Sequence, residues 1–95
     1  MRVQGIIWKK DVVEKLERKH QVQTWEVEEV LNNQPTIYFV EKGNISGENL
    51  YLALGQGDDG RYLAVYFVYK STKDALIITA RDMNTKERRR YGKRK

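Results

Sequence analysis

Apolar residues in the first third of the chain recur at the spacing of one short strand and two helices. Residues 3–8 are an apolar run of strand length. In residues 9–20 and 24–33, apolar side chains recur at helical spacing, which is typical of helices that bury one face. The residues on these apolar faces are Val12, Val13 and Leu16 in the first helix and Val27, Val30 and Leu31 in the second. We therefore expect a strand followed by two helices.

The ends of the second predicted helix carry residues that favour helix termini. Thr24 is a suitable N-cap, because its hydroxyl can accept a hydrogen bond from a backbone N–H of the first turn. Pro35 prevents the helix from continuing. Glu26, Glu28 and Glu29 are expected to face solvent, where they interact favourably with the helix dipole.

Beyond Pro35 the pattern takes the shorter period of β-strands. Leu50, Leu52 and Leu54 alternate with other residues and should share one face of a strand. Asp58-Asp59-Gly60 is a strong signal for a hairpin turn. The predicted strands are residues 36–40, 49–55, 61–69 and 75–80. Because short turns join consecutive strands, we expect their sheet to be antiparallel.

A last, short helix is expected after the final strand. Asn84 can cap it, and Glu87, three residues later, completes a variant of the capping box. The helix carries almost no apolar face, so its basic residues should be exposed. Arg81 lies at the exit of the last strand, just before this helix.

Together these elements predict an α+β fold. We expect an antiparallel sheet of about four to five strands, two N-terminal helices packed on one face, and a short basic C-terminal helix. The other face carries tyrosines and threonine and is a candidate groove. With 95 residues, the chain is long enough for one compact domain and too short for two, so residues 1–95 should form a single domain.

The positive charge of the chain is concentrated in a C-terminal tail, residues 86–95. The chain has a net charge of +5, whereas this tail has seven basic residues and one acidic residue, a net charge of +6. A dense cationic segment attracts polyanions such as RNA, because binding releases counterions from the phosphates. A solvated tail that only aids solubility is the alternative interpretation.

The composition excludes several classes of site. The chain has no cysteine, so it has neither disulfides nor thiolate metal ligands, and this fits a cytoplasmic protein. No apolar run reaches the length of a signal peptide or a membrane-spanning helix, so we expect no membrane contact. A single histidine and scattered aspartates offer no zinc or two-metal site, so we expect no metal and no cofactor.

Three stretches, in order and at fitting spacing, resemble one known family. The first runs from Lys19-His20-Gln21-Val22 through Glu-Val-Glu-Glu-Val-Leu to Pro35. The second joins Leu54-Gly55 to the Gly-Arg-Tyr-Leu-Ala-Val hairpin that begins at Gly60. The third, and most specific, is Ala-Arg-Asp-Met followed by Glu-Arg-Arg-Arg-Tyr at the C-terminal end. Together they resemble the BrnT-like family of type II toxins, in the RelE-like superfamily of ribonuclease toxins.

This resemblance implies a RelE-like fold and an endoribonuclease of the mRNA interferase type. Toxins of this kind cut RNA and are silenced by a cognate antitoxin. The BrnT antitoxin combines a toxin-wrapping region with a ribbon-helix-helix DNA-binding part, so a hetero-oligomer of toxin and antitoxin is expected.

A catalytically inactive RNA- or protein-binding module of the same fold is the alternative function. Two departures from the family pattern keep this alternative open. Trp8 is followed by Lys9 where the family commonly has Trp-Asp, and Tyr51 and Leu52 stand where an arginine is often seen.

RNA can be cut without a metal because its own 2′-hydroxyl is the nucleophile, and arginine suits the charge that develops on the phosphate. Arg81 is the best candidate for phosphate binding; its alternative role is an ion pair with Asp82 or a glutamate. Arg61 is a second candidate, and it could equally pair with Asp58 or Asp59 of the hairpin.

The candidates for proton transfer lie mostly in the first helix. His20 is the only histidine; its pKa range suits acid–base chemistry, although a histidine at a helix end often has a structural role. The family has a lysine in its first helix, for which Lys10 and Lys15 are both candidates, Lys10 for catalysis and Lys15 for RNA binding. Tyr66 and Tyr91 are the tyrosines that could act in place of His20.

The arginine run of the tail is expected to contact RNA without doing chemistry. Arg88, Arg89 and Arg90 would follow the RNA backbone, and Tyr91 would stack or pack beside them. The same residues could dock an acidic segment of the antitoxin, in which case inhibition would consist of occupying the RNA site.

Overall fold

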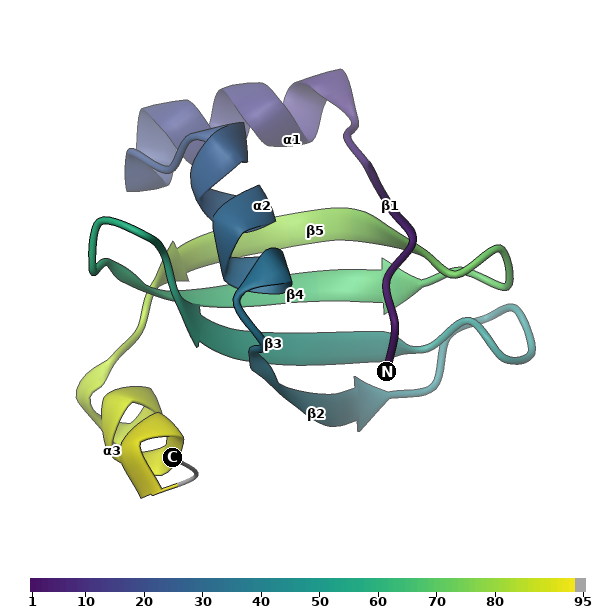
Figure 1. Cartoon of the computed structure of the whole chain (residues 1–95). Helices are drawn as coiled ribbons and strands as arrows, with labels where there is room; N and C mark the ends of the chain where they lie inside the picture. The colour runs from purple at the N-terminus through teal and green to yellow at the C-terminus, as the bar shows by residue number, and fades with distance from the viewer. Residues whose placement is uncertain (94–95) are drawn as a thin grey trace.

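The computed structural model describes residues 1–93 as a five-stranded sheet with helices on both faces (Figure 1). In chain order the elements are β1 (Gly5–Ile7), α1 (Lys10–Lys15), the π-helix η1 (Leu16–His20), α2 (Thr24–Asn32), β2 (Thr36–Glu41), β3 (Leu50–Gln56), β4 (Tyr62–Tyr69), β5 (Asp74–Asp82) and α3 (Thr85–Lys93). The predicted α+β fold class is therefore confirmed. The last two residues of the predicted basic tail lie outside the described part of the chain.

The sheet is mixed, with the strand order β1-β5-β4-β3-β2. Strands β2 to β5 pair antiparallel, as the short turns between them require. The expectation of a purely antiparallel sheet was wrong for β1, which pairs parallel with the start of β5, Gly5 opposite Asp74. These two strands are not joined by a hairpin, so turn geometry does not dictate their relative direction.

The main core lies between the sheet and the N-terminal helices. Phe67 and Ile77 from the sheet, Leu16 from η1, and Val27 and Val30 from α2 are fully buried there. The helix α2 crosses β3 so closely that a Cβ atom added at Gly55 would lie 2.8 Å from a methyl group of Val30. Glycine at this position is therefore a condition for the packing of α2 on the sheet.

The first predicted helix consists of two segments. The α-helix α1 continues directly into the π-helical turn η1, which ends where Gln21 takes a left-handed φ of +50°. The N–H of Val22 then donates to the carbonyl of Leu16 (3.1 Å) and closes the turn. Both Leu16 and Val22 are buried, so this wide turn keeps two apolar side chains in the core.

The start of α2 also differs from the prediction. The helix begins at Thr24, so Gln23 is its N-cap residue. The backbone N–H of Gln23 donates to the carboxylate of Glu26 (2.9 Å), the third residue of the helix. The carboxylate of Glu26 thus supplies one hydrogen bond of a capping box at Gln23, and the prediction that Thr24 is the N-cap was wrong by one residue.

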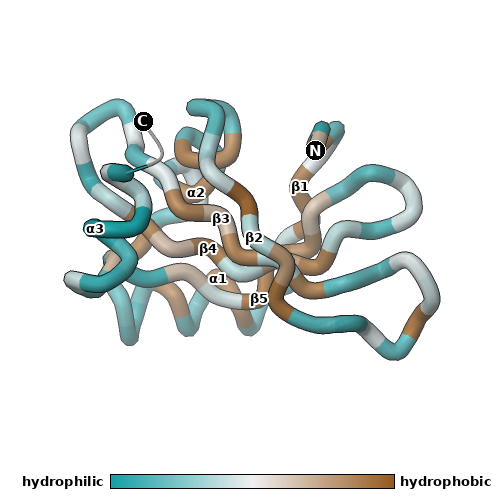
Figure 2. Tube along the Cα trace, turned by 90° about the horizontal axis from the view of Figure 1, so that it is seen from below, coloured by the Kyte–Doolittle hydropathy of each residue, from teal (hydrophilic) through white to brown (hydrophobic). Residues whose placement is uncertain are grey.

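The opposite face of the sheet is partly covered by α3. Tyr91 is only 7% exposed and packs with Leu52, Leu54, Ala64 and Met83 in a second apolar cluster. The prediction that this helix has almost no core face is confirmed, because Tyr91 is its only buried residue among those described. A single tyrosine is large enough to anchor the helix. The rest of α3 is hydrophilic, in contrast to the strands beside it (Figure 2).

The capping box of α3 is confirmed. The backbone N–H of Glu87 donates to the side chain of Asn84 (2.8 Å), and the N–H of Asn84 donates to the carboxylate of Glu87 (3.0 Å). These reciprocal bonds fix where α3 begins, at Thr85, four residues beyond Arg81. In the described part of the chain, no helix is long and apolar enough to cross a membrane.

The two phenylalanines test the burial pattern. Phe67→Ala should lower the free energy of unfolding by about 3–5 kcal/mol, because it leaves a cavity in the main core. Phe39→Ala is the matched control: this side chain is 58% exposed on the edge strand β2, so its loss should cost about 1 kcal/mol or less. Urea unfolding of both variants measures the difference, and equal losses would contradict the core described above.

Candidate functional site

Arg81 lies at the end of β5 and faces the side of the sheet that carries α3. In the register between β4 and β5, Arg81 lies opposite Ala64, a residue of the second apolar cluster. Its guanidinium carbon lies 5.9 Å from the centre of the Tyr66 ring. Two of its nitrogens donate to the carboxylate of Glu87, Nη1 at 2.6 Å and Nη2 at 2.9 Å. Arg81 is thus directed at the first turn of α3, in a bidentate ion pair, and also contacts a tyrosine.

This ion pair affects both partners electrostatically. Hydrogen bonds from Arg81 hold the pKa of the Glu87 carboxyl below its usual value, and those with Glu87 raise the pKa of Arg81. Tyr66 makes a smaller contribution to the raised pKa of Arg81. Arg81 therefore stays charged, and Glu87 is a carboxylate at neutral pH.

The arginines of α3 lie on tyrosine rings of the sheet. The guanidinium carbon of Arg90 is 3.5 Å from the ring centre of Tyr38, and that of Arg88 is 3.7 Å from the ring centre of Tyr62. Residues two apart on a helix point to opposite sides, so these two arginines flank α3 instead of forming one row. Arg89 is exposed, and it extends away from the buried Tyr91.

Side-chain alternation places one cluster of these residues beside α3. In the strand register, Tyr38, Leu52, Tyr66 and Thr79 lie in one row across β2, β3, β4 and β5. Glu87 and Arg90 are three residues apart and share one side of α3. We call the resulting surface the arginine–tyrosine face; it consists of Tyr38, Tyr66, Arg81, Glu87 and Arg90.

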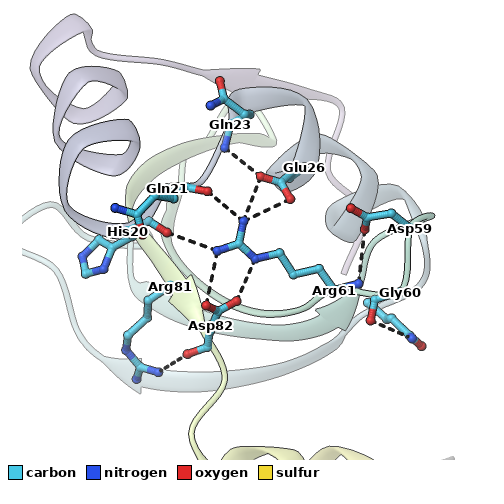
Figure 3. Close-up of polar contacts among 10 residues, drawn as sticks. His20, Gln21, Gln23, Glu26, Asp59, Gly60, Arg61, Arg81 and Asp82 are labelled. Atoms are coloured by element: carbon cyan, nitrogen blue, oxygen red, sulfur yellow. Dashed lines mark hydrogen bonds and ion pairs between the residues drawn. The ribbon is translucent and has the colours of Figure 1, made fainter.

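Arg61 forms a separate cluster on the other side of β5 (Figure 3). Its Nε donates to Asp82 (2.7 Å), and its Nη1 donates to both oxygens of Glu26 (3.1 Å each). Nη1 and Nη2 also donate to the carbonyls of Gln21 (2.8 Å) and His20 (3.1 Å). One side chain thus joins the β3–β4 hairpin, the end of η1, the start of α2 and the end of β5.

The geometry of this cluster corrects one expectation and resolves an alternative. Glu26 was expected to face solvent, but it is 6% exposed and turned toward Arg61. The side chain of Arg61 pairs with Asp82 and Glu26, and only its backbone N–H contacts the hairpin carboxylate of Asp59 (3.2 Å). A phosphate would have to displace one of these carboxylates to bind Arg61.

His20 lies next to the same cluster. Its carbonyl is held by Arg61, and its charge contributes, after the hydrogen bonds and charge of Arg61, to the lowered pKa of Asp82. Because Asp82 follows Arg81 directly, the structure brings His20, Arg61 and Arg81 to one end of β5.

The two lysine candidates lie elsewhere. Lys10 begins α1 just after β1, which pairs with the first residues of β5 and not with its exit. Lys15 is exposed at the end of α1, in the helical layer on the opposite face from α3. Neither is brought together with Arg81.

Sequence reasoning missed two residues of the arginine–tyrosine face. Glu87 was named only as a capping residue; an ion pair of Arg81 with a glutamate was an expected alternative, but which glutamate depends on the angle at which α3 turns back over the sheet. Tyr38 could have been placed on this face only from the register between β2 and β3. Tyr66 was identified as a tyrosine that could act in place of His20, although its position on this face was not predicted.

Comparison with known proteins shows the family to which the chain belongs. Residues 8–87 match the model of the family described as ribonuclease toxin, BrnT, of type II toxin–antitoxin system. The chain belongs to the BrnT family. A search among curated proteins found no match. Membership of BrnT implies an RNA substrate and an antitoxin partner, as the sequence resemblance predicted. The match includes Arg81 and Glu87 and ends before Arg88–Arg90.

The donor groups of this BrnT protein suit an anion better than a metal. The arginine–tyrosine face offers two guanidinium groups and two phenols against one carboxylate. Within residues 1–93, no three His, Asp or Glu side chains are grouped so that they could hold a metal ion.

The ion pair between Arg61 and Asp82 predicts a pH-dependent contribution to stability. The pKa of Asp82 is lowered in the folded protein, so its contribution is present above the unfolded pKa of about 3.9 and is lost as pH falls through the folded value. Asp82→Asn should therefore be less stable than wild type at pH 7 by about 1 kcal/mol, because Asp82 is largely exposed to solvent.

The difference should shrink as pH falls below the unfolded pKa and disappear once pH lies below the folded pKa of Asp82. Urea unfolding midpoints at a series of decreasing pH values measure it. Asp11→Asn, the same charge change at an exposed position of α1, is the control. A difference between wild type and Asp82→Asn that stays constant with pH would show that the ion pair is not its source.

Proposed function

We propose that this BrnT protein is an endoribonuclease of the mRNA interferase type, which cleaves RNA by attack of the substrate's own 2′-hydroxyl and needs no metal ion. The observation that carries the proposal is the arginine–tyrosine face, where Arg81 and Arg90 lie on one side of α3 above tyrosine rings. In metal-free cleavage, positive groups must stabilise charge on the phosphorane, and guanidinium groups match phosphate oxygens.

The proposal assigns a role to each residue of this face. Arg81 binds the scissile phosphate through the nitrogens that now contact Glu87. Tyr66, whose phenol lies beside Arg81, donates a proton to the leaving 5′-oxygen. Tyr38 and Arg90 form a stacked platform for a neighbouring base or phosphate of a single strand.

Other sequence candidates take supporting roles in this proposal. Arg61 is a positioning residue, because its guanidinium already holds Asp82 and Glu26. His20 is the alternative proton donor, since it lies at the same end of β5. Arg88 and Arg89 attract the RNA backbone from other sides of α3, and Lys10 and Lys15 contribute no more than charge at a distance.

The proposal extends to the partner and the setting. By family likeness, the antitoxin is of the ribbon-helix-helix type, the two proteins form a hetero-oligomer, and both act in the cytoplasm. Light scattering of the co-expressed pair would give the stoichiometry, and a mass equal to that of the toxin alone would oppose the hetero-oligomer.

Cleavage of a defined RNA tests the enzymatic proposal. Purified toxin should cut a labelled RNA and leave a 2′,3′-cyclic phosphate, either alone in EDTA or, in a separate reaction that contains Mg²⁺, together with translating ribosomes. A single 2′-deoxy substitution at the cleaved nucleotide should block that cut. Arg81→Gln should lower the cleavage rate by about 100- to 1,000-fold, as expected for loss of a donor to the developing charge.

Arg18→Gln is the matched control, because it removes the same charge from an exposed position of η1, away from the arginine–tyrosine face. It should change the rate by less than about threefold, in line with a distant charge. RNA left intact under all of these conditions would favour the alternative, an inactive binding module of the same fold.

The salt dependence of RNA binding tests the role of Arg90. Arg90→Gln should reduce the slope of log K against log salt by about 0.7, the value for one phosphate contact with a single strand. Binding of a 2′-O-methyl RNA oligonucleotide, measured from 50 to 300 mM salt, gives this slope. Arg18→Gln, an exposed arginine of η1, is the control and should leave it unchanged.

A further inference from the structure

The carboxylate of Glu87 occupies the position at Arg81 that a phosphate would need. Both nitrogens of Arg81 that point toward α3 donate to it, at 2.6 and 2.9 Å, and the N–H of Asn84 donates to it at 3.0 Å. Its side chain is only 12% exposed, although it belongs to the first turn of a helix that is otherwise hydrophilic. Glu87 is thus an internal anion at the candidate phosphate site.

A phosphodiester and Glu87 compete for the same donors. When a phosphate binds to Arg81, the carboxylate loses one or both of its bonds to the guanidinium but keeps its bond to Asn84. It therefore remains beside the bound phosphate. In RNA the 2′-hydroxyl is adjacent to the phosphate that it attacks, so a carboxylate beside that phosphate can accept a hydrogen bond from the 2′-hydroxyl when it lies on the same side.

We propose that Glu87 is the general base of the reaction, and that in the absence of RNA it also holds Arg81 in an ion pair. This inference rests on the proposed function, because a base for the 2′-hydroxyl has a role only if RNA is cleaved. It assigns a catalytic task to a residue that the sequence identifies only as a helix cap.

The reaction step balances with groups of this face. Glu87 accepts the proton of the 2′-hydroxyl while the 2′-oxygen forms a bond to phosphorus. The bond from phosphorus to the 5′-oxygen breaks, and the phenol of Tyr66 gives its proton to that oxygen. The products are a 2′,3′-cyclic phosphate and a 5′-hydroxyl, and exchange with water returns a proton from Glu87 to Tyr66.

The electrostatics of the site favour this order of events. Before RNA binds, Arg81 lowers the pKa of Glu87, which keeps it ionised and ready to accept a proton. When Arg81 turns to the phosphate, the pKa of Glu87 rises toward its usual value, so the carboxylate becomes a stronger base as the nucleophile arrives.

A purely structural role for Glu87 is the competing explanation, because it closes the capping box with Asn84. Glutamine is accepted at this position of a capping box, since its amide oxygen can receive the same N–H. Glu87→Gln therefore keeps the helix cap and removes both the base and the ion pair. Glu14→Gln, at an exposed position of α1, makes the same charge change away from the face.

The test compares cleavage with binding in the full-length protein. Glu87→Gln should cut the labelled RNA about 100- to 10,000-fold more slowly than wild type, the range for loss of a general base. The same variant should bind the uncleavable 2′-O-methyl oligonucleotide about 2- to 5-fold more tightly, because Arg81 no longer has an internal competitor. Glu14→Gln should match wild type in cleavage.

The outcomes separate this inference from the proposed function. If Glu87→Gln cleaves RNA as fast as wild type, or loses binding together with cleavage, Glu87 is a cap or a positioning residue and the inference is wrong. If wild type itself leaves RNA intact with and without ribosomes, the proposed function fails first. Slower cleavage combined with unchanged or tighter binding supports a general base.

Discussion

Consecutive side chains of a β-strand point to opposite faces of the sheet, and at the end of β5 this constraint separates Arg81 from Asp82. Asp82 faces the N-terminal helices and is held by Arg61, together with Glu26 and the end of η1. Arg81 faces α3 and is held by Glu87. The arginine–tyrosine face and the polar cluster that joins four elements are therefore fixed by two neighbouring residues of one strand.

Most of the fold follows from the spacing of apolar residues, because burial of a sheet face imposes a strict period of two. Leu50, Leu52 and Leu54 were expected to share a face, and in the structure Leu52 and Leu54 form the floor under α3. The parallel pairing of β1 could not be predicted, since it depends on a contact between Gly5 and Asp74, which lie at distant points in the chain.

Only part of the candidate site could be predicted from the sequence. Arg81 could be identified from its place at a strand exit and from the family resemblance, and the family is confirmed by the match to residues 8–87. The partners of Arg61 could not be predicted from the sequence. Glu26 and Asp82 are 35 and 21 residues away, and they approach Arg61 only after the sheet and helices pack. The composition suggested that the basic residues of the tail form one continuous positive surface. The helix instead places Arg88 and Arg90 on different tyrosine rings.

The tethering of the first residues has a practical consequence for work with this toxin. The N–H of Gln4 donates to the carbonyl of Lys73, and the hydroxyl of Tyr69 contacts the carbonyl of Arg2. Gln4 is therefore held at the β4–β5 turn, and the residues before it line a pocket with Leu31 and Ile37 on the face of the sheet that carries the N-terminal helices. The helix α3 packs on the opposite face. An affinity tag or fluorophore attached at the amino end would therefore leave the arginine–tyrosine face accessible.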